Sequence, residues 1–526
     1  MSRFVLSGVP AHPIASSAVA EAVAVDDGRI MAVGVRPTVL AAAGPDATEV
    51  RLDRGALLPG FVDAHHAHLI VTGPSTDVLY RKAGDVPGLL EVVRGLRHLP
   101  GSWLRLHGYE PLELNELRSP TGAEIDAVVA DRPVHLISPS FHESAVNTLG
   151  LEQLEATGPR DTRRGCSWAA GAARRVCSSS RPASAKAVSR AAAQPELDRG
   201  RLAWHAKRLF AAGITTICDA AVPVTASAGY VEAAARLGLR VTPPLVGARF
   251  DTPAVLPGST AKVLVGGGAY CHLCLTGRQV AALAASSLRA ALGRDGRLVR
   301  AVGRRAGFPI RAGHGLFRTI TLTGTEALRT LIGESSSTDS RLAVHAIGNG
   351  ALHAVLDARQ AVAGSEVALR VEHAMALDGQ DAEILAGAGI PVVVQPGFLA
   401  AIGHHLDTVP LPAPLHLMPF ASLLRARTAL ALSSDHPAAD LNPWAGIASA
   451  VTRADRFGRA ILGAEAVSVR AAITAYTASA ADLVWVQPDP FTCAAERLGA
   501  IATLTTWSAG TLRYASADSG LRGSSS

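Results

Sequence analysis

The sequence predicts an α/β protein whose largest part is a (β/α)8 barrel of the TIM type. Short apolar runs alternate with Ala- and Leu-rich stretches, which is the pattern of parallel strands joined by helices. Eight such runs over about 380 residues fit the spacing of this barrel with insertions. They are the strand that opens at Leu57 and residues 134–137, 214–218, 261–265, 342–344, 369–372, 390–394 and 428–432.

The chain before Leu57 predicts a separate small β domain. Residues 22–25 and 29–34 are short strand candidates. Asp26-Asp27-Gly28 between them is a turn signal, because glycine adopts positive φ at low cost. With 526 residues, the chain is long enough for this domain and for the barrel.

The composition predicts a soluble globular protein, with 48% hydrophobic and 18% charged residues. We find no run of about 18 uncharged apolar residues and no signal-peptide core after Met1, so a cytoplasmic protein without membrane association is expected. The six cysteines are scattered, which fits reduced thiols. Cys271 and Cys274 form a lone C-x-x-C pair, which is a weak signal for redox or metal chemistry.

The net charge of +6 arises in one segment. Residues 161–190 hold seven basic side chains and one acidic one, so the rest of the chain sums to zero. A nucleic-acid groove would interleave basic and aromatic residues, and this segment has only Trp168, so nucleic acid is not an expected partner. Residues 161–200 and 266–318 are predicted to be irregular insertions, or segments translated out of frame. Residues 516–526 are predicted to be a disordered tail.

Histidines follow the opening strand. The stretch from Leu57 reaches His65, His66 and His68 just past its apolar part. Residues i and i+2 of an extended segment point the same way, so His66 and His68 can bind one metal ion through neutral ring nitrogens. A short H-x-H pattern also fits solvated loop histidines, so its meaning depends on the other strand ends.

Metal-ligand side chains recur at the ends of other predicted strands: His345, His373 and Asp435 follow three of them, and Lys262 lies inside a fourth. The carboxyl ends of barrel strands meet on one face, where catalytic groups collect. Lys262 is unexpected, because only four of the 50 basic residues are lysines and a buried ammonium is costly. Carboxylated on its amine, Lys262 would be an anionic ligand able to bridge two metals. The alternative is a lysine that extends its amine from the strand end to solvent.

Four motifs together resemble the metal-dependent amidohydrolase superfamily, specifically the branch that includes N-substituted formamide deformylases. They are Pro59-Gly60-Phe61-Val62-Asp63-Ala64-His65 with His68-Leu69, Val344-His345-Ala346-Ile347-Gly348-Asn349-Gly350-Ala351, Arg370-Val371-Glu372-His373-Ala374 and Ser433-Ser434-Asp435-His436-Pro437. Phe141-His142-Glu143-Ser144-Ala145-Val146-Asn147 is similar to a segment on the substrate side of that branch.

The resemblance implies a fold and a site. Residues 1–56 and about 480–515 would form one small β-sandwich, and residues 57–479 would form the metal-dependent barrel. The cofactor would be one or two divalent ions, with zinc expected, and His142 would contact a small-molecule substrate. The implied metal ligands are His66, His68, His345, His373 and Asp435, with Lys262 carboxylated if the site holds two metals.

The resemblance also implies hydrolysis of carbon–nitrogen bonds other than peptide bonds, in amides, N-substituted formamides or cyclic amides. A metal-activated water would attack the carbonyl carbon, and Asp435 would take its proton and pass it to the leaving nitrogen. Two other classes stay open from the sequence alone. One is a catalytically impaired relative with a degenerate barrel, and the other, less favoured, is a basic binding protein. A homo-oligomer is compatible with each of them.

The sequence departs from the family pattern in several places. The Asp-x-His-x-His pattern contains one extra residue, so either His65 or His66 partners His68, and His66 is preferred because it keeps the i, i+2 geometry. Asn349 stands where an aspartate is usual. After Lys262 the usual Asp-Gly is replaced by three glycines, and the Pro-Gly-Lys turn expected near the end of the chain is missing.

Overall fold

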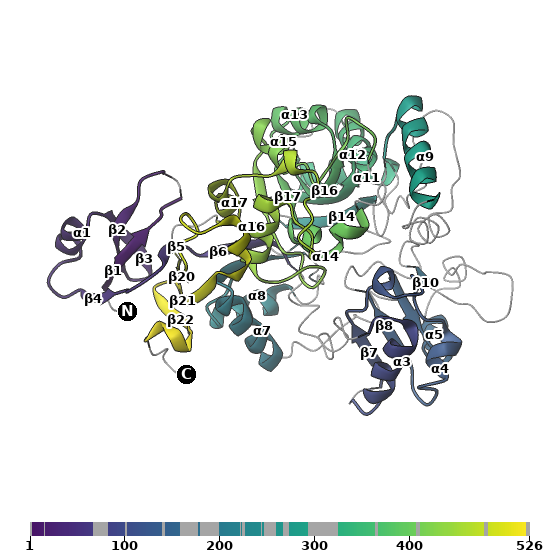
Figure 1. The fold of residues 1–526 in the computed structure, drawn as a ribbon, viewed down its shortest axis with the longest axis horizontal. Helices are drawn as coiled ribbons and strands as arrows, with labels where there is room; N and C mark the ends of the chain where they lie inside the picture. The colour runs from purple at the N-terminus through teal and green to yellow at the C-terminus, as the bar shows by residue number, and fades with distance from the viewer. Residues whose placement is uncertain are drawn as a thin grey trace.

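Among the residues that it describes, the computed structural model contains four β-sheets and the helices that cover them (Figure 1). It describes residues 3–14, 16–66, 83–99, 102–138, 143–157, 177–178, 199–220, 222, 227–242, 245–246, 259–266, 273–292, 325–362, 367–406, 411–477 and 482–521.

The first sheet is built from both ends of the chain, and the two termini lie at the same end of the molecule (Figure 1). Its strand order is β22-β21-β20-β5-β1-β2-β3, with β4 paired to β1. The predicted turn at Gly28 is confirmed, since β2 and β3 pair antiparallel around it and its φ is 75°. The elements are β1 (Phe4–Ala11), β2 (Ala20–Asp26), β3 (Arg29–Gly34), α1 (Arg36–Ala43), β4 (Thr48–Arg51), β5 (Ala56–Pro59), β20 (Leu483–Gln487), η5 (Ala495–Ala500), β21 (Ala502–Ser508) and β22 (Thr511–Ala515).

The end of the chain is more ordered than the sequence suggested. Residues 516–521, predicted to belong to a disordered tail, include the short helix η6 (Ala517–Ser519). Ser519 is buried, and Arg54 donates a hydrogen bond to the carbonyl of Asp518. The tail prediction failed there because polar composition alone does not reveal packing against a neighbouring sheet. Residues 522–526 lie outside the described part.

Two all-parallel runs of strands form the centre of the molecule. One has the order β12-β11-β6, and the other has the order β13-β14-β15-β16-β17-β19, with the short strand β18 antiparallel to β16. The strands are β6 (Phe61–His66), β11 (Ile214–Asp219), β12 (Arg240–Val241), β13 (Leu245–Val246), β14 (Thr260–Gly266), β15 (Arg341–Gly348), β16 (Ala368–Leu377), β17 (Val392–Val394), β18 (His416–Leu417) and β19 (Leu430–Leu432).

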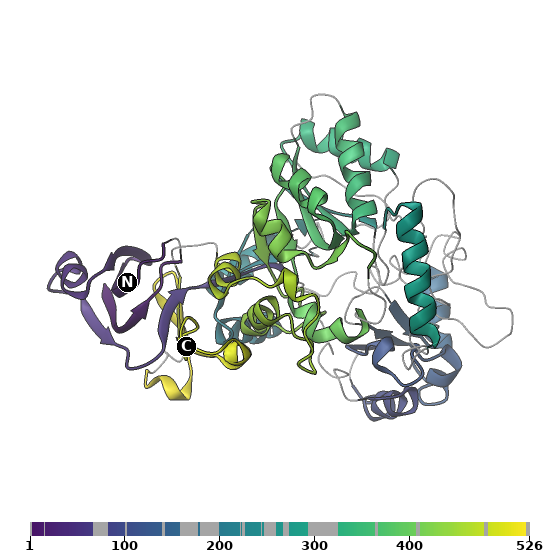
Figure 2. The same cartoon turned by 45° about the horizontal axis from the view of Figure 1, so that its top comes forward.

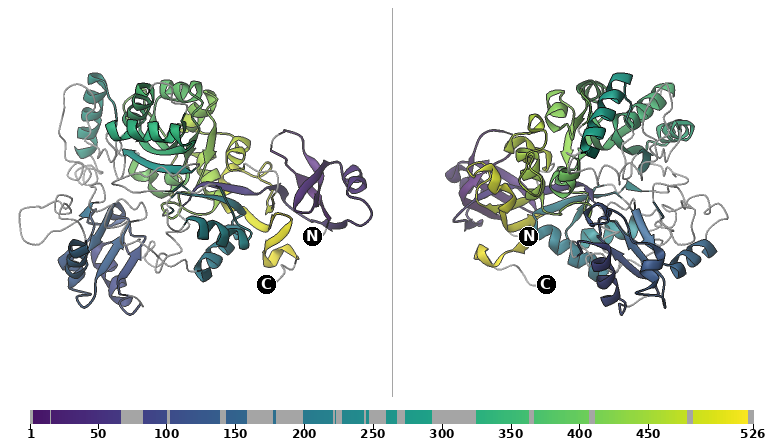
Figure 3. Two further views of the ribbon diagram at one scale, coloured as in Figure 1. Left: turned by 180° about the vertical axis from the view of Figure 1, so that it is seen from behind. Right: turned by 45° about the vertical axis from the view of Figure 1, so that its right-hand side comes forward.

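Helices connect these parallel strands and lie around them, as the view from behind shows for the green part of the chain (Figure 3). The interior is apolar, and Trp444 is fully buried with its ring 5.4 Å from that of Phe61. The helices are α7 (Arg199–Ala211), α8 (Ser227–Arg236), α11 (Thr325–Ser337), α12 (Asn349–Ala361), α13 (Gly379–Gly387), α14 (Gly397–Leu406), α15 (Phe420–Arg425), α16 (Pro443–Thr452), η4 (Gly463–Glu465) and α17 (Val469–Ala475).

The chain passes from the terminal sheet into the central strands at Gly60. Leu57 and Leu58, predicted to open the barrel, lie in β5, which pairs with β20 of the terminal sheet. A Cβ at Gly60 would lie 2.6 Å from Oγ1 of Thr215 and 2.8 Å from Cβ of Asp482. Only glycine therefore fits this crossing without moving its neighbours.

One predicted barrel strand belongs elsewhere. Residues 134–137 form β8 in a separate sheet of order β10-β9-β8-β7. This sheet is blue in Figure 1 and lies apart from the central strands. The prediction was wrong because an apolar run shows that a strand is buried but not which sheet contains it. The elements of this unit are α3 (Val86–Gly95), β7 (Leu104–His107), η1 (Pro111–Glu113), α4 (Gly122–Asp126), β8 (Val134–Ile137), β9 (Glu143–Val146), α5 (Thr148–Thr157) and β10 (Cys177–Ser178).

Part of a stretch predicted to be irregular is a helix. Within residues 266–318, helix α9 (Gly277–Leu292) stands at the edge of the molecule, far from the terminal sheet (Figures 1 and 2). Its Ala- and Leu-rich sequence has high helix propensity. The prediction treated it together with the arginine-rich residues that follow, and so missed the helix. Residues 161–176 and 179–198 lie outside the described part. None of the helices in the described ranges is long and apolar enough to cross a membrane.

Candidate metal centre

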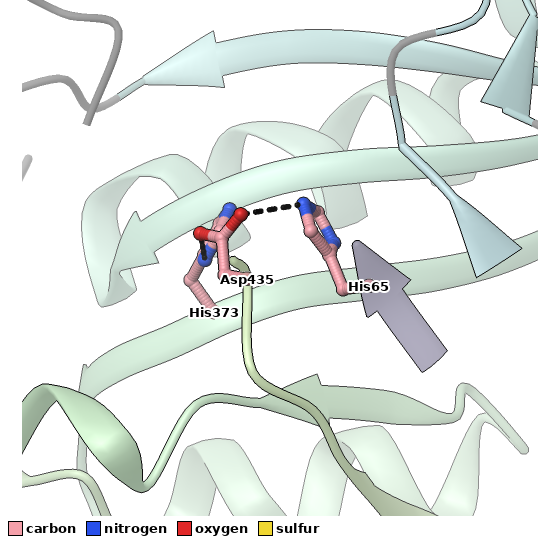
Figure 4. Close-up of side chains that lie close together, drawn as sticks. All are labelled: His65, His373 and Asp435. Carbon is pink, nitrogen blue, oxygen red and sulfur yellow. Dashed lines mark ion pairs between the residues drawn. The ribbon is translucent and has the colours of Figure 1, made fainter. Parts of the chain in front are cut away.

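Two histidines and an aspartate converge where three strands end. His65 comes from β6, His373 from β16, and Asp435 follows β19 (Figure 4). One ligand atom from each lies within 4.8 Å of the other two. Nε2 of His65 is 3.5 Å from Oδ1 of Asp435, and Nδ1 of His373 is 3.9 Å from Oδ2 of the same carboxylate. The histidines are buried and Asp435 is partly exposed.

The backbone at the cluster is held in unusual conformations. His373 and Asp435 have φ values of 79° and 52°, a region that residues with a Cβ rarely adopt. Such conformations cost about 1–3 kcal/mol each and persist only where the surroundings enforce them. Asp435 is held by its own amide, which donates to the carbonyl of His65 at 2.9 Å. The residue before it is held by Asp63, which accepts hydrogen bonds from the backbone amide (2.8 Å) and the hydroxyl of Ser434.

Lys262 and His345 border the cluster. Nζ of Lys262 lies 3.2 Å from Nε2 of His65, and the side chain is buried. Burial lowers the pKa of the Lys262 amine, which favours its neutral form. The ring of His345 packs edge-on against that of His373, with centroids 4.3 Å apart.

Burial and nearby charge shift the pKa values of the cluster in different directions. Burial raises the pKa of Asp435, against the opposing effect of His65 and Lys262. Burial also lowers the pKa of His373 well below its usual value, so this imidazole is neutral. A neutral imidazole is the form in which histidine binds a metal.

The extra residue in the opening motif changes which histidine faces the cluster. His65 is the member of the pair that lies beside His373 and Asp435, whereas His66 lies on the other side of β6. Nδ1 of His66 is 3.0 Å from Asp63, and its Nε2 is 3.0 Å from Nε2 of His205. Neighbouring side chains on a strand point to opposite faces, so His65 and not His66 lies in this cluster. Which of the two partners His68 stays a prediction. His68 and His142 lie outside the described residues.

Several buried polar residues beside the cluster had no role assigned from the sequence. Glu372 accepts a hydrogen bond from His65, and Gln395 lies 2.8 Å from Nδ1 of His373. His205 on α7 lies beside His66 on the other side of β6, and it carried no motif, so nothing in the sequence marked it. Glu372 did carry a signal, because Arg370 and Glu372 alternate with apolar residues on a strand that is otherwise buried.

Asn349, which replaces the usual aspartate of the family motif, has its own partner. Its Oδ1 accepts from the amide of Cys274 at 2.9 Å, and its Nδ2 donates to the carbonyl of Cys274 at 3.2 Å. An aspartate could make only the first of these bonds, because an ionised carboxylate has no proton to donate. The departure from the family pattern is thus matched by a local contact of this chain.

The chain belongs to the amidohydrolase family. A model described as "Amidohydrolase family" matches residues 49–484, a range that contains His65, His373 and Asp435. The α/β class and the predicted resemblance are confirmed by this match and by the relatives.

Individual relatives agree with this family. The chain is 27% identical over 538 aligned residues to N-substituted formamide deformylase of Arthrobacter pascens, which covers 95% of this chain and 96% of that protein. A shorter alignment of 150 residues, 27% of this chain and 25% of the relative, is 33% identical to Protein LONG AFTER FAR-RED 3 of Arabidopsis thaliana.

Solved structures share the fold. Uncharacterized metal-dependent hydrolases from Pyrococcus horikoshii OT3 and Pyrococcus furiosus superpose with TM-scores of 0.60 and 0.58 at 18% identity each. The alignments cover 90% of this chain and 92% and 93% of those chains.

Proposed function

We propose that this protein is a metal-dependent hydrolase that cleaves carbon–nitrogen bonds other than peptide bonds. The observation that carries the proposal is the convergence of His65, His373 and Asp435 at three strand ends, beside the buried Lys262. Two imidazoles and a carboxylate form a donor set that suits zinc, and a catalytic zinc site keeps one coordination position open. The partial exposure of Asp435 fits such an open side.

The proposal includes a closed (β/α)8 barrel. If β12 and β13 are two halves of one strand position, the two parallel runs supply eight positions from β6 to β19. The backbone amide of Asp435 donates to the carbonyl of His65 at 2.9 Å, which would bring the last position against the first. The terminal sheet would be the small β domain that accompanies the barrel in this fold.

In the proposed reaction, His65, His373 and Asp435 would hold the metal and His345 would complete the shell. Lys262 would join as a carboxylated ligand if two ions were bound. When bound, the metal would lower the pKa of a water molecule and polarise the scissile carbonyl. Asp435 would accept the proton of the attacking water through its carboxylate and deliver it to the leaving nitrogen.

We propose N-substituted formamides as the first substrate class to test, supported by the alignment with the deformylase over nearly the whole of both chains. The test is metal analysis of purified protein together with formate release from N-substituted formamides, with N-acetyl and cyclic amides in parallel. One or two zinc equivalents per chain with zinc-dependent turnover of one of these classes is the expected result. A folded protein that retains no added zinc, or that binds zinc and cleaves none of them, would instead indicate a catalytically impaired relative.

A further inference from the structure

A carboxylate with no exposure to solvent lies directly behind His65. Oε2 of Glu372 is 2.5 Å from Nδ1 of His65, and the Glu372 side chain is completely buried. An ionised carboxylate can only accept hydrogen bonds, so Nδ1 of His65 must carry the proton. The other ring nitrogen, Nε2, then offers its lone pair toward Lys262 and Asp435.

The same carboxylate is held from its other side by Arg370. Nε of Arg370 donates to Oε1 of Glu372 at 2.5 Å, and its Nη2 donates to the carbonyl of Ala64 at 3.1 Å. Ala64 is the residue before His65, so one guanidinium fixes both the carboxylate and the backbone next to the histidine. A planar guanidinium with several donors suits this double contact, whereas a lysine has a single ammonium.

The local conformation of β16 makes this arrangement compatible with His373 in the cluster. In a regular strand, Glu372 and His373 would point to opposite faces. The positive φ of 79° at His373 interrupts that alternation. One strand can therefore supply His373 to the cluster and Glu372 to the back of His65.

We propose that Glu372, braced by Arg370, is a positioning residue that fixes the tautomer and ring orientation of His65 so that Nε2 faces the cation. The inference rests on the proposed metal-dependent function. Carboxylates behind metal-binding histidines have this effect in general, and their removal typically weakens metal binding 10- to 100-fold.

The chain contains a matched control. Glu465 is also completely buried and accepts a hydrogen bond from a histidine, with Nδ1 of His416 at 2.7 Å. Its further partners are Ser422, whose amide donates at 2.9 Å and whose hydroxyl donates at 2.6 Å, and Arg425, whose Nη2 lies 3.7 Å from Oε1. Neither His416 nor Ser422 belongs to the metal cluster. Glu465→Gln therefore removes a buried carboxylate–histidine contact of the same kind without touching His65.

The experiment uses full-length protein stripped of metal with a chelator and titrated with Co²⁺, whose visible absorption reports ligand geometry. Glu372→Gln should weaken Co²⁺ binding about 10- to 100-fold and alter the absorption spectrum. Glu465→Gln should lower thermal stability but leave the affinity and the spectrum unchanged. If Glu372→Gln does not fold, Arg370→Lys is measured in its place. It should also weaken Co²⁺ binding, because it removes the guanidinium that holds Glu372.

Equal affinities and spectra for the wild type and Glu372→Gln would overturn the inference, as would an equal loss in Glu465→Gln. A wild-type protein that binds no Co²⁺ would overturn the inference and the proposed function together. A wild type that binds Co²⁺ but hydrolyses none of the tested amides would count against the function alone, because the binding comparison could still be made.

Discussion

The backbone amide of Asp435 donates a hydrogen bond to the carbonyl of His65 at 2.9 Å. This bond joins the segment after β19 to the end of β6, which are 370 positions apart in the chain. Asp63 reinforces the junction, because its carboxylate accepts from the amide and the hydroxyl of Ser434. The relative position of His65 and Asp435 is therefore set by buried hydrogen bonds within the protein.

Ser434→Ala should loosen this junction without removing any cluster side chain. The substitution deletes the hydroxyl that donates to Asp63 and accepts from the amide of His436 at 2.9 Å, but it keeps the Ser434 amide that also donates to Asp63. Loss of the buried bond to the charged Asp63 should by itself lower the free energy of unfolding by about 1.5–3 kcal/mol, and loss of the acceptor for His436 should add to this. Urea denaturation measures this, and Ser468→Ala, which removes an exposed helix cap, is a control expected to cost about 1 kcal/mol. A Ser434→Ala protein as stable as the wild type would argue against the junction.

His65 and His66 give a paired test of the register. Both side chains are almost completely buried, but only His65 lies in the cluster. His65→Gln should lose bound zinc, whereas His66→Gln should retain it although it loses its contacts with Asp63 and His205. Metal content measured by mass spectrometry separates the two. Retention of zinc by His65→Gln with loss by His66→Gln would restore the register preferred from the sequence.

The convergence of His373 and Asp435 could be predicted from the sequence, because parallel strands bring polar residues at their carboxyl ends together. The choice between His65 and His66 could not, since both fit an i, i+2 or i, i+3 relation to His68. The sheet that contains residues 134–137 was also beyond prediction, because pairing partners are set by tertiary packing. Glu372 was visible as part of a motif, but its contact with His65 joins two strands that are far apart in the chain, which no local pattern encodes.

Asp435→Asn should separate metal binding from proton transfer. Asparagine keeps an oxygen that can act as a ligand but cannot accept the proton of the attacking water as a carboxylate does. We expect turnover to fall at least about 100-fold, which is the lower range for loss of a general base. The measurement is kcat with metal content determined on the same sample. Asp440→Asn, at an exposed position on the same segment, is the control. Undiminished kcat at unchanged metal content would remove Asp435 from the role of base.

The buried His135, in the separate sheet of β7 to β10, should make the stability of the folded protein depend on pH. Burial lowers its pKa to about 3, with a further contribution from Arg105. The unfolded chain has a histidine pKa near 6.5, so below that pH the unfolded state binds a proton that the folded state does not. Stability should therefore be complete above about pH 6.5 and fall as the pH drops toward 3. Between pH 7 and 5.5 this one residue should account for about 1 kcal/mol.

Chemical denaturation at pH 7 and 5.5 tests this for the wild type and for His135→Gln, which should show a smaller loss. His353 is a control of opposite sign, because its hydrogen bond with Asp381 raises its pKa. The stability that protonated His353 contributes is fully present below the unfolded pKa and is lost as the pH rises. His353→Gln should therefore increase the stability that the protein loses between pH 7 and 5.5. An unchanged pH dependence in His135→Gln would show that His135 is not buried as a neutral imidazole.

Asn349→Asp tests whether asparagine, which stands where the family motif usually has aspartate, is needed for the contact with Cys274. Aspartate keeps the bond from the amide of Cys274 but loses the donor to the carbonyl of Cys274 and places a negative charge beside it. A fully buried carbonyl without its partner costs about 1–3 kcal/mol, and the carbonyl of Cys274 is partly buried, so the free energy of unfolding should fall by an amount at the lower end of that range. Hydrogen exchange around Cys274 should accelerate.

Asn442→Asp is the matched control for this change. Oδ1 of Asn442 accepts from the amide of Trp444 at the start of α16, a helix cap that uses only the acceptor. Aspartate caps a helix as well as asparagine does, so this variant should stay within about 0.5 kcal/mol of the wild type. If both variants were equally stable, the bidentate contact of Asn349 would not explain why asparagine occupies the position. A loss confined to Asn349→Asp would mean that reverting to the family residue requires a compensating change in the segment around Cys274.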